Sequence, residues 1–431
     1  MSYHLRLRTN AHMIRLICNG RKFRDCFKKN QCIQMFELST RDGPDIMTTR
    51  QKRLRIHGTI ADVPTLTGGP RFLDMVEVDL VSGLITATSD DNVDDQSSLD
   101  IEVINLPPHA VLIPGLVDCH IHGSQFPFHG TGLSRPLMAD DGFLHGHAFP
   151  TEKCFQDPEF AKQVYPRVVQ SLIDNGTTTA AYYGTIHRHG TLELAKTCVS
   201  KGQRAFVGMV QLDKMMDEED INTMKCNGNG NADLTYMENT TDLCLRETER
   251  FLNDFEAAID NQNCNSSPSL VQPILTPRFI PSCSQRLLEG LAEITKRTKT
   301  RLGIQTHIQE STDEVMMAEK EWNTAENSDN AVYESDLQVF RDCKLLAKKN
   351  DDESFLIAAH GVHIDVDKGV DKQILQDYSV GIAHCPLSNF YFADGVLDVM
   401  KLHAEKLRNF RNALSNLLFR TTHRLLQMNP L

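Results

Sequence analysis

The sequence predicts an α/β fold: a (β/α)8-type TIM barrel that is incomplete, with about seven strands, joined to a small N-terminal β-sandwich-like domain. Short apolar or β-branched runs alternate with helix-like stretches, and several histidines follow those runs. Strands that alternate with helices form a parallel sheet, and this many of them favour a barrel over an open sheet. The 431 residues are enough for such a barrel, which commonly uses about 250 residues as one unit.

The predicted barrel elements follow from periodicity. Helices with 3.6-residue spacing are expected between most strands, and Pro166 predicts a kink or a late start in the helix at Pro158–Asn175. The clearest other helices are Leu192–Ser200, Thr241–Asp260, Ser284–Lys296 and Ser335–Lys348. The predicted strands are 111–118, 177–183, 204–211, 270–276, 302–307, 354–360 and 379–384.

Composition divides the chain into four parts. Residues 1–50 are basic and predict a disordered extension, with an organelle-targeting presequence as the alternative. Residues 51–110 predict the small β domain, and residues 111–400 the barrel. Residues 401–431 predict an atypical amphipathic helix that replaces the last barrel unit. The expected strands of the small domain are Leu54–Ile60, Met75–Val81 and Leu84–Thr88.

Bulk properties exclude several function classes. A net charge of -12 argues against nucleic-acid binding, because such proteins concentrate Lys and Arg on one face. No apolar stretch approaches the roughly 18 residues needed to span a bilayer, so no membrane partner is expected. The 12 cysteines form no Cys-x-x-Cys pair and follow no secretory segment. We therefore expect reduced thiols, a cytoplasmic location and a small-molecule substrate.

Histidines at the ends of predicted strands indicate a metal site. His120 and His122 close an apolar run, and residues i and i+2 of a strand face the same way. Alone, such a spacing equally fits a surface pair. His307, His360 and His384 end three later strands, and the carboxyl ends of barrel strands meet at one rim. Side chains from several strands can therefore converge on one cation.

Zinc held by neutral imidazoles lowers the pKa of a bound water to about 7. Glu310, three residues after His307, can serve as the base, with helix capping or a solvated carboxylate as the alternative. His360 could ligate the metal or orient the water, and we favour orientation. For His384, hydrogen-bonded support of the site and ordinary packing are equally weighted.

Several segments carry a family resemblance. Residues 114–122, Pro-Gly-Leu-Val-Asp-Cys-His-Ile-His, resemble the opening signature of the amidohydrolase superfamily. Further segments resemble its guanine deaminase branch in order and spacing, over about residues 52 to 400. They are Gly123–Gln125, Phe149–Glu152, Asn175–Thr179, Gly202–Gly208, Thr276–Phe279, His307–Glu310 and Ile382–Pro386.

The resemblance implies hydrolysis of guanine to xanthine and ammonia, with one Zn²⁺ ion per chain and a homodimer. It makes His120, His122 and His307 the zinc ligands. Glu310 becomes the proton shuttle, and His360 lies beside the metal-bound water. Phe279, and less surely Phe149, would cover the flat base, with core packing as the alternative for Phe149. The implied substrate-binding set is His122, Gly123, Ser124, Gln125, Arg278, Phe279, His307 and Glu310.

The sequence departs from the family at one ligand. The family supplies an aspartate after an eighth strand, in a Gly-Thr-Asp context, and this sequence has no aspartate after Asp398. We therefore expect either a truncated isoform or gene model of an active enzyme, or a catalytically impaired relative that serves as a binding scaffold. A deaminase of another heterocycle is a further alternative.

Overall fold

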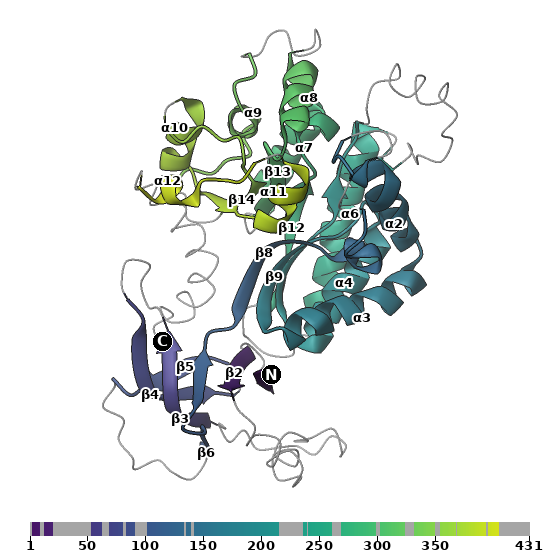
Figure 1. Ribbon diagram of the computed structural model, residues 1–431. Helices are drawn as coiled ribbons and strands as arrows, with labels where there is room; N and C mark the ends of the chain where they lie inside the picture. Colours follow the sequence, from purple (N-terminus) through teal and green to yellow (C-terminus); the bar gives the residue numbers. More distant parts are fainter. Residues whose placement is uncertain are drawn as a thin grey trace.

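The computed structural model describes most of the chain and places a small β-sheet below an α/β barrel (Figure 1). Among the described residues, no helix is both long and apolar enough to cross a bilayer. The described residues are 2–8, 13–19, 53–62, 69–80, 83–90, 101–132, 135–138, 142–214, 236–238, 240–260, 269–298, 302–323, 332–349, 354–367, 369–393 and 395–404.

The small sheet has seven strands, in the order β1-β2-β7-β3-β4-β5, with β6 paired to β3. Its core forms because side chains alternate between faces, so that Leu54, Ile56 and Ile60 of β3 are buried together. At Gly58 the strand changes partner from β6 to β7, and φ is 138°, which only glycine adopts freely. The strands are β1 (Ser2–Arg8), β2 (Met13–Asn19), β3 (Arg53–Asp62), β4 (Arg71–Asp79), β5 (Ile85–Thr88), β6 (Ile101–Asn105) and β7 (Ala110–Ile113).

Two observations bear on this region. β1 and β2 pair with each other, and β2 also pairs with β7, so the structure describes these parts of residues 1–50 as strands of the sheet. The other residues of that segment lie outside the described part of the chain. The strands are joined in one hydrogen-bonded sheet, in which β3 pairs with β4, β6 and β7.

The barrel is a nearly closed parallel sheet, as predicted. Its strand order is β15-β14-β13-β12-β10-β9-β8, and within the described residues β8 and β15 are its two edges. The predicted strand 111–118 is in fact two elements, because β7 belongs to the small sheet and β8 to the barrel. The barrel strands are β8 (Leu116–His122), β9 (Thr177–Tyr183), β10 (Arg204–Gly208), β12 (Val271–Pro277), β13 (Gly303–Ile308), β14 (Leu356–His360) and β15 (Val380–Ala383), and β11 (Val210–Gln211) pairs with β12.

Helices cover the outside of the barrel (Figure 1) and bury their apolar faces against the strands. The main helices are α3 (Pro158–Asp174), α4 (Arg188–Lys201), α6 (Thr241–Asp260), α7 (Gln285–Arg297), α8 (Thr312–Trp322), α9 (Asp336–Asp342) and α10 (Val370–Asp377). Shorter helices near the open rim are η2 (Gly123–Phe128), η3 (Leu144–Ala148), α2 (Phe149–Lys153), η4 (Cys154–Gln156), η5 (Ile280–Ser282), α11 (Pro386–Phe392) and α12 (Val399–Ala404).

Three predicted helices differ from the structure in where they begin or end, or are described only in part. Of the two effects predicted for Pro166, a kink or a late start, the structure excludes the late start, because α3 begins at Pro158 and runs through Pro166. α9 ends at Asp342, short of the predicted Lys348, and Lys344 just beyond it has a φ of 64°. The predicted C-terminal helix is described only as α12, because residues 405–431 lie outside the described part of the chain.

Candidate active site

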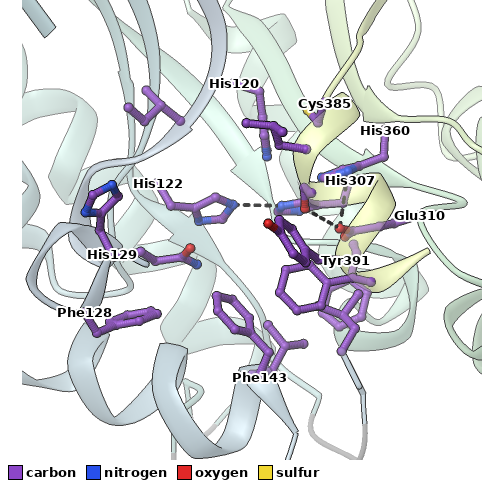
Figure 2. Close-up of a pocket in the computed structure, with 18 of the residues that line it drawn as sticks. His120, His122, Phe128, His129, Phe143, His307, Glu310, His360, Cys385 and Tyr391 are labelled. Carbon is purple, nitrogen blue, oxygen red and sulfur yellow. Dashed lines mark hydrogen bonds and ion pairs between the residues drawn. The ribbon is translucent and has the colours of Figure 1, made fainter. Parts of the chain in front are cut away.

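Three imidazoles converge at the carboxyl ends of two strands. His120 and His122 end β8, and His307 lies near the end of β13 (Figure 2). The ring centroid of His120 lies 5.0 Å from that of His122 and 4.8 Å from that of His307. The Nε2 atoms of His122 and His307 are 2.9 Å apart. One potential ligand atom from each residue falls within 4.8 Å of the others, which is close enough to share one ion.

The protonation of these rings suits a metal ligand. His307 Nδ1 donates a hydrogen bond to the carbonyl oxygen of Arg278 at 2.6 Å, which leaves the Nε2 lone pair facing the other rings. Burial among protein atoms lowers the pKa of all three imidazoles well below the ordinary value, and nearby positive charge, including that of Arg278, lowers the pKa of His120 and His122 further. The rings are therefore neutral near pH 7, as coordination requires.

The donor set fits a zinc ion. The Nδ1 atoms of His120 and His122 are buried and have no hydrogen-bond partner among the described residues. Buried polar atoms without partners are costly, so these two imidazoles have bonding capacity that a ligand of the site can use. Imidazole nitrogens are ligands that zinc prefers. His120, His360 and Cys385 form a second group whose ligand atoms also lie within 4.8 Å of one another.

Glu310 faces the same cluster from the turn after β13. Its Oε1 lies 3.3 Å from Nδ1 of His360 and accepts a hydrogen bond from Ser388 Oγ at 3.2 Å (Figure 2). The N-terminus of α8 is capped by Ser311 instead, whose side chain accepts from the backbone of Glu314. Capping is therefore not the task of Glu310, and its carboxylate reaches the cavity.

The two later histidines differ in position. His360 lines the cavity, with its ring centroid 5.2 Å from that of His120, and its Nδ1 also lies 2.9 Å from Asn389 Oδ1. Its backbone is left-handed, with a φ of 70°, which is a strained conformation of the kind found at functional sites. His384 does not line the cavity, and burial and the charge of His360 lower its pKa.

A cavity of about 550 Å³ opens beside the imidazoles. Of the predicted substrate-binding residues, Gly123 and Ser124 do not line it, and their role in binding stays a prediction. Gly123 lies against Tyr165 and Tyr182, and Ser124 is buried with its Oγ 3.5 Å from the carbonyl oxygen of Gly184. Those that do line it are His122, Gln125, Arg278, Phe279, His307 and Glu310.

A buried ion pair fixes Arg278. Its Nη1 donates to Glu152 Oε2 at 2.7 Å, and its Nη2 lies 3.4 Å from Glu152 Oε1. Burial lowers the pKa of Arg278, but Glu152 outweighs this effect and the net pKa is raised. The guanidinium also lies 4.8 Å from the ring centroid of Phe149, which does not line the cavity but packs beneath this pair.

Sequence reasoning missed several residues of the site. Glu152 and Asn389 were not assigned roles, although a buried arginine requires an anionic partner and Glu152 lies within a segment already noted. Tyr183, the last residue of β9, has its ring centroid 4.9 Å from that of His120 and 4.7 Å from those of His122 and His307. Its hydroxyl is buried and has no hydrogen-bond partner in the described part of the chain.

Fold and site together place imidazoles at the carboxyl ends of parallel strands with a carboxylate beside them, an arrangement typical of metal-dependent hydrolase barrels. The chain belongs to the amidohydrolase family, whose sequence model matches residues 111–410.

Individual relatives agree with this membership. The probable guanine deaminase of Schizosaccharomyces pombe is 35% identical over 297 residues, which are 69% of this chain and 48% of that protein. The guanine deaminase of Rattus norvegicus is 34% identical over 307 residues, 71% of this chain and 58% of that protein. The chain thus spans about half the length of the curated relatives it matches. A guanine deaminase structure from C. acetobutylicum with bound guanine aligns with a TM-score of 0.65 at 23% identity, covering 87% of this chain and 80% of that one.

Proposed function

We propose that the chain is a guanine deaminase that hydrolyses guanine to xanthine and ammonia. The observation that carries the proposal is the convergence of three neutral imidazoles on the wall of a cavity that Gln125, Arg278 and Glu310 also line. The similarity to guanine deaminases at 34% and 35% identity supports the choice of substrate.

His120, His122 and His307 would hold one zinc ion. Zinc held in this way supplies Lewis acidity and a water that is ionised near neutral pH. The neutral rings and the hydrogen bond from His307 to the carbonyl oxygen of Arg278 support this assignment, because the bond fixes the tautomer that leaves Nε2 free.

The remaining residues bind the base and move protons. Gln125 offers a donor and an acceptor to the purine edge, and Arg278 offers a cation to a ring carbonyl. Glu310 accepts one proton of the attacking water and passes it to a ring nitrogen. The second water proton then moves to the amino group, which leaves as ammonia, and the water oxygen stays on the ring as a carbonyl. His360 lies 3.3 Å from Glu310 and orients this carboxylate and the water.

Three further parts of the proposal rest on sequence and resemblance. The barrel and the small sheet form separate domains, with the boundary near residue 110; the chain is cytoplasmic; and it forms a homodimer. Limited proteolysis, imaging of the tagged full chain and light scattering test these three points in that order.

The decisive experiment measures ammonia release from guanine by the purified full chain, together with its zinc content. We expect one zinc per chain and turnover that is lost in E310Q, which keeps the shape of the side chain but not its basicity. Zinc binding without turnover would contradict the proposal and favour an impaired, scaffold-like relative. A panel of other purines, pterins and triazines separates guanine from related heterocycles.

A further inference from the structure

Glu310 stands three residues after His307, and a regular strand would point these two side chains to opposite faces. The structure brings both to the cavity wall, because β13 ends at Ile308 and Gln309 departs from strand geometry. Gln309 has a φ of 43°, in the left-handed region that residues other than glycine rarely occupy. The direction of the Glu310 carboxylate therefore depends on one strained backbone position.

Two buried carboxylates hold the backbone of this turn. Asp336, at the start of α9, accepts the Gln309 backbone N–H on Oδ2 at 2.8 Å. Glu314 accepts the Glu310 backbone N–H on Oε2 at 2.5 Å. Both acids are almost fully buried, with exposed fractions of 0% and 1%. Hydrogen bonds in such buried surroundings are stronger than in water, so they can stabilise a conformation that the chain would otherwise leave.

A third residue fixes Asp336 itself. The Tyr333 hydroxyl donates to Asp336 Oδ1 at 2.8 Å, so each oxygen of the carboxylate has one partner. Asp336 touches neither the cavity nor an imidazole ligand. Among the described residues, its hydrogen bond to the site is the one that it accepts from the Gln309 peptide.

We propose that Asp336, oriented by Tyr333, is a positioning residue that keeps Gln309 left-handed and thereby aims Glu310 at the reacting centre. This inference rests on the proposed function, since it gives Glu310 a catalytic task. It predicts that losing Asp336 impairs proton transfer, while the base-binding residues Gln125 and Arg278 stay in place.

The first test compares D336A with D213A. Asp213 is the matched control because it also accepts one backbone N–H, from Ser284 at 2.8 Å, and hydroxyl donors, but it lies away from the cavity wall. We expect kcat for guanine to fall about 100-fold in D336A, the typical effect of misplacing a catalytic group by about 1 Å. KM should change by less than about threefold, because ground-state binding is retained. D213A should retain the wild-type kcat.

The second test is a rescue. Glycine adopts positive φ without penalty, so Q309G in the D336A background should recover at least about tenfold of the lost kcat. A merely structural role of Asp336 gives no reason for this recovery. Y333F keeps the Asp336 carboxylate but removes the hydroxyl that orients it, so kcat should fall in the same direction and by less than in D336A. This variant tests the proposal if D336A folds poorly. The proposal is overturned if Q309G restores nothing in a folded D336A chain, or if D213A loses as much kcat as D336A.

Amide hydrogen exchange supplies a readout that does not depend on turnover. The Gln309 amide should exchange more than about tenfold faster in D336A and remain protected in D213A, because only the first variant removes its acceptor. If the wild-type chain does not deaminate guanine, the proposed function fails. The exchange measurement still tests whether Asp336 protects the backbone N–H of Gln309. Unchanged protection at Gln309 in D336A would refute the positioning role whatever the substrate.

Discussion

Removing the charge of Glu152 should destabilise the chain strongly, because it leaves the cation of Arg278 buried without a partner. The two side chains have exposed fractions of 0% and 2%, and their shortest N–O distance is 2.7 Å. At an effective dielectric constant of about 20, charges this close attract by roughly 6 kcal/mol. Part of that attraction only offsets the cost of desolvating both groups, so we expect E152Q to lower the free energy of unfolding by about 3–5 kcal/mol.

The loss should be relieved by a second substitution. In E152Q/R278M the buried cation is gone, and methionine keeps much of the apolar stem of arginine. Leaving one charge of a buried pair without its partner is what costs most, so the double variant, which lacks that charge, should be more stable than E152Q alone. As a control, E293Q breaks an exposed pair with Lys296 on α7 and should leave the free energy of unfolding close to that of wild type, because water screens such a pair.

Urea unfolding followed by fluorescence measures these differences. The chain has a single tryptophan, Trp322, which is buried in α8 and reports on the barrel. The denaturant slope should stay constant across the variants, so that shifts in midpoint report stability alone. The reasoning is refuted if E152Q lies within about 1 kcal/mol of wild type, or if R278M adds to the loss in the double variant instead of relieving it.

Three further predictions concern the metal, pH and backbone packing. H307A should lower zinc affinity by more than the roughly 10–100-fold that is typical when a residue hydrogen-bonded to a metal ligand is lost. Metal analysis after dialysis measures this, and a wild-type zinc content in H307A would contradict the prediction. Burial raises the pKa of Asp371 from 3.8 to about 6, so its protonated form favours folding; this stabilisation is complete below about pH 4 and is lost as the pH rises through 6. The free energy of unfolding of D371N should therefore rise by up to about 3 kcal/mol relative to that of wild type as the pH increases from 4 to 7. Urea titrations at pH 4 and at pH 7 measure this difference, and an equal difference at both pH values would exclude the linkage. A Cβ on Gly208 would lie 1.8 Å from Thr276 Oγ1 and 2.8 Å from a backbone oxygen, so G208A should lower the free energy of unfolding by at least about 1–3 kcal/mol. The control is G69A, which has open space around the new methyl group and should have the melting temperature of wild type.

The sequence was sufficient to predict the barrel and the residue types at its rim. Apolar runs separated by helical patterns predicted the parallel strands, and histidines at the ends of those runs predicted convergence. Both inferences succeed because the strands of a parallel barrel all present their carboxyl ends to one rim. The local alternation of side chains also placed His120 and His122 correctly on one side of β8.

Segment boundaries were less predictable. The run at 111–118 is continuous in hydrophobicity, yet β7 and β8 belong to different sheets. Likewise the basic character of the first residues gave no sign that β1 and β2 join the small sheet. Strand membership depends on which backbone partners lie within reach, and hydrophobicity along a single segment does not contain that information.

Only the tertiary structure identified the residues that support the site. Glu152 reaches Arg278 across 126 positions, and Asp336 reaches Gln309 across 27, so neither contact leaves a local pattern in the sequence. The left-handed residue of the turn is likewise Gln309 and not a glycine, so the sequence does not indicate its positive φ. Sequence by itself determined which chemical groups arrive at the rim, because periodicity and strand direction are local properties. The folded chain decided where those groups point, because buried charges and strained peptides are held in place by partners from distant segments.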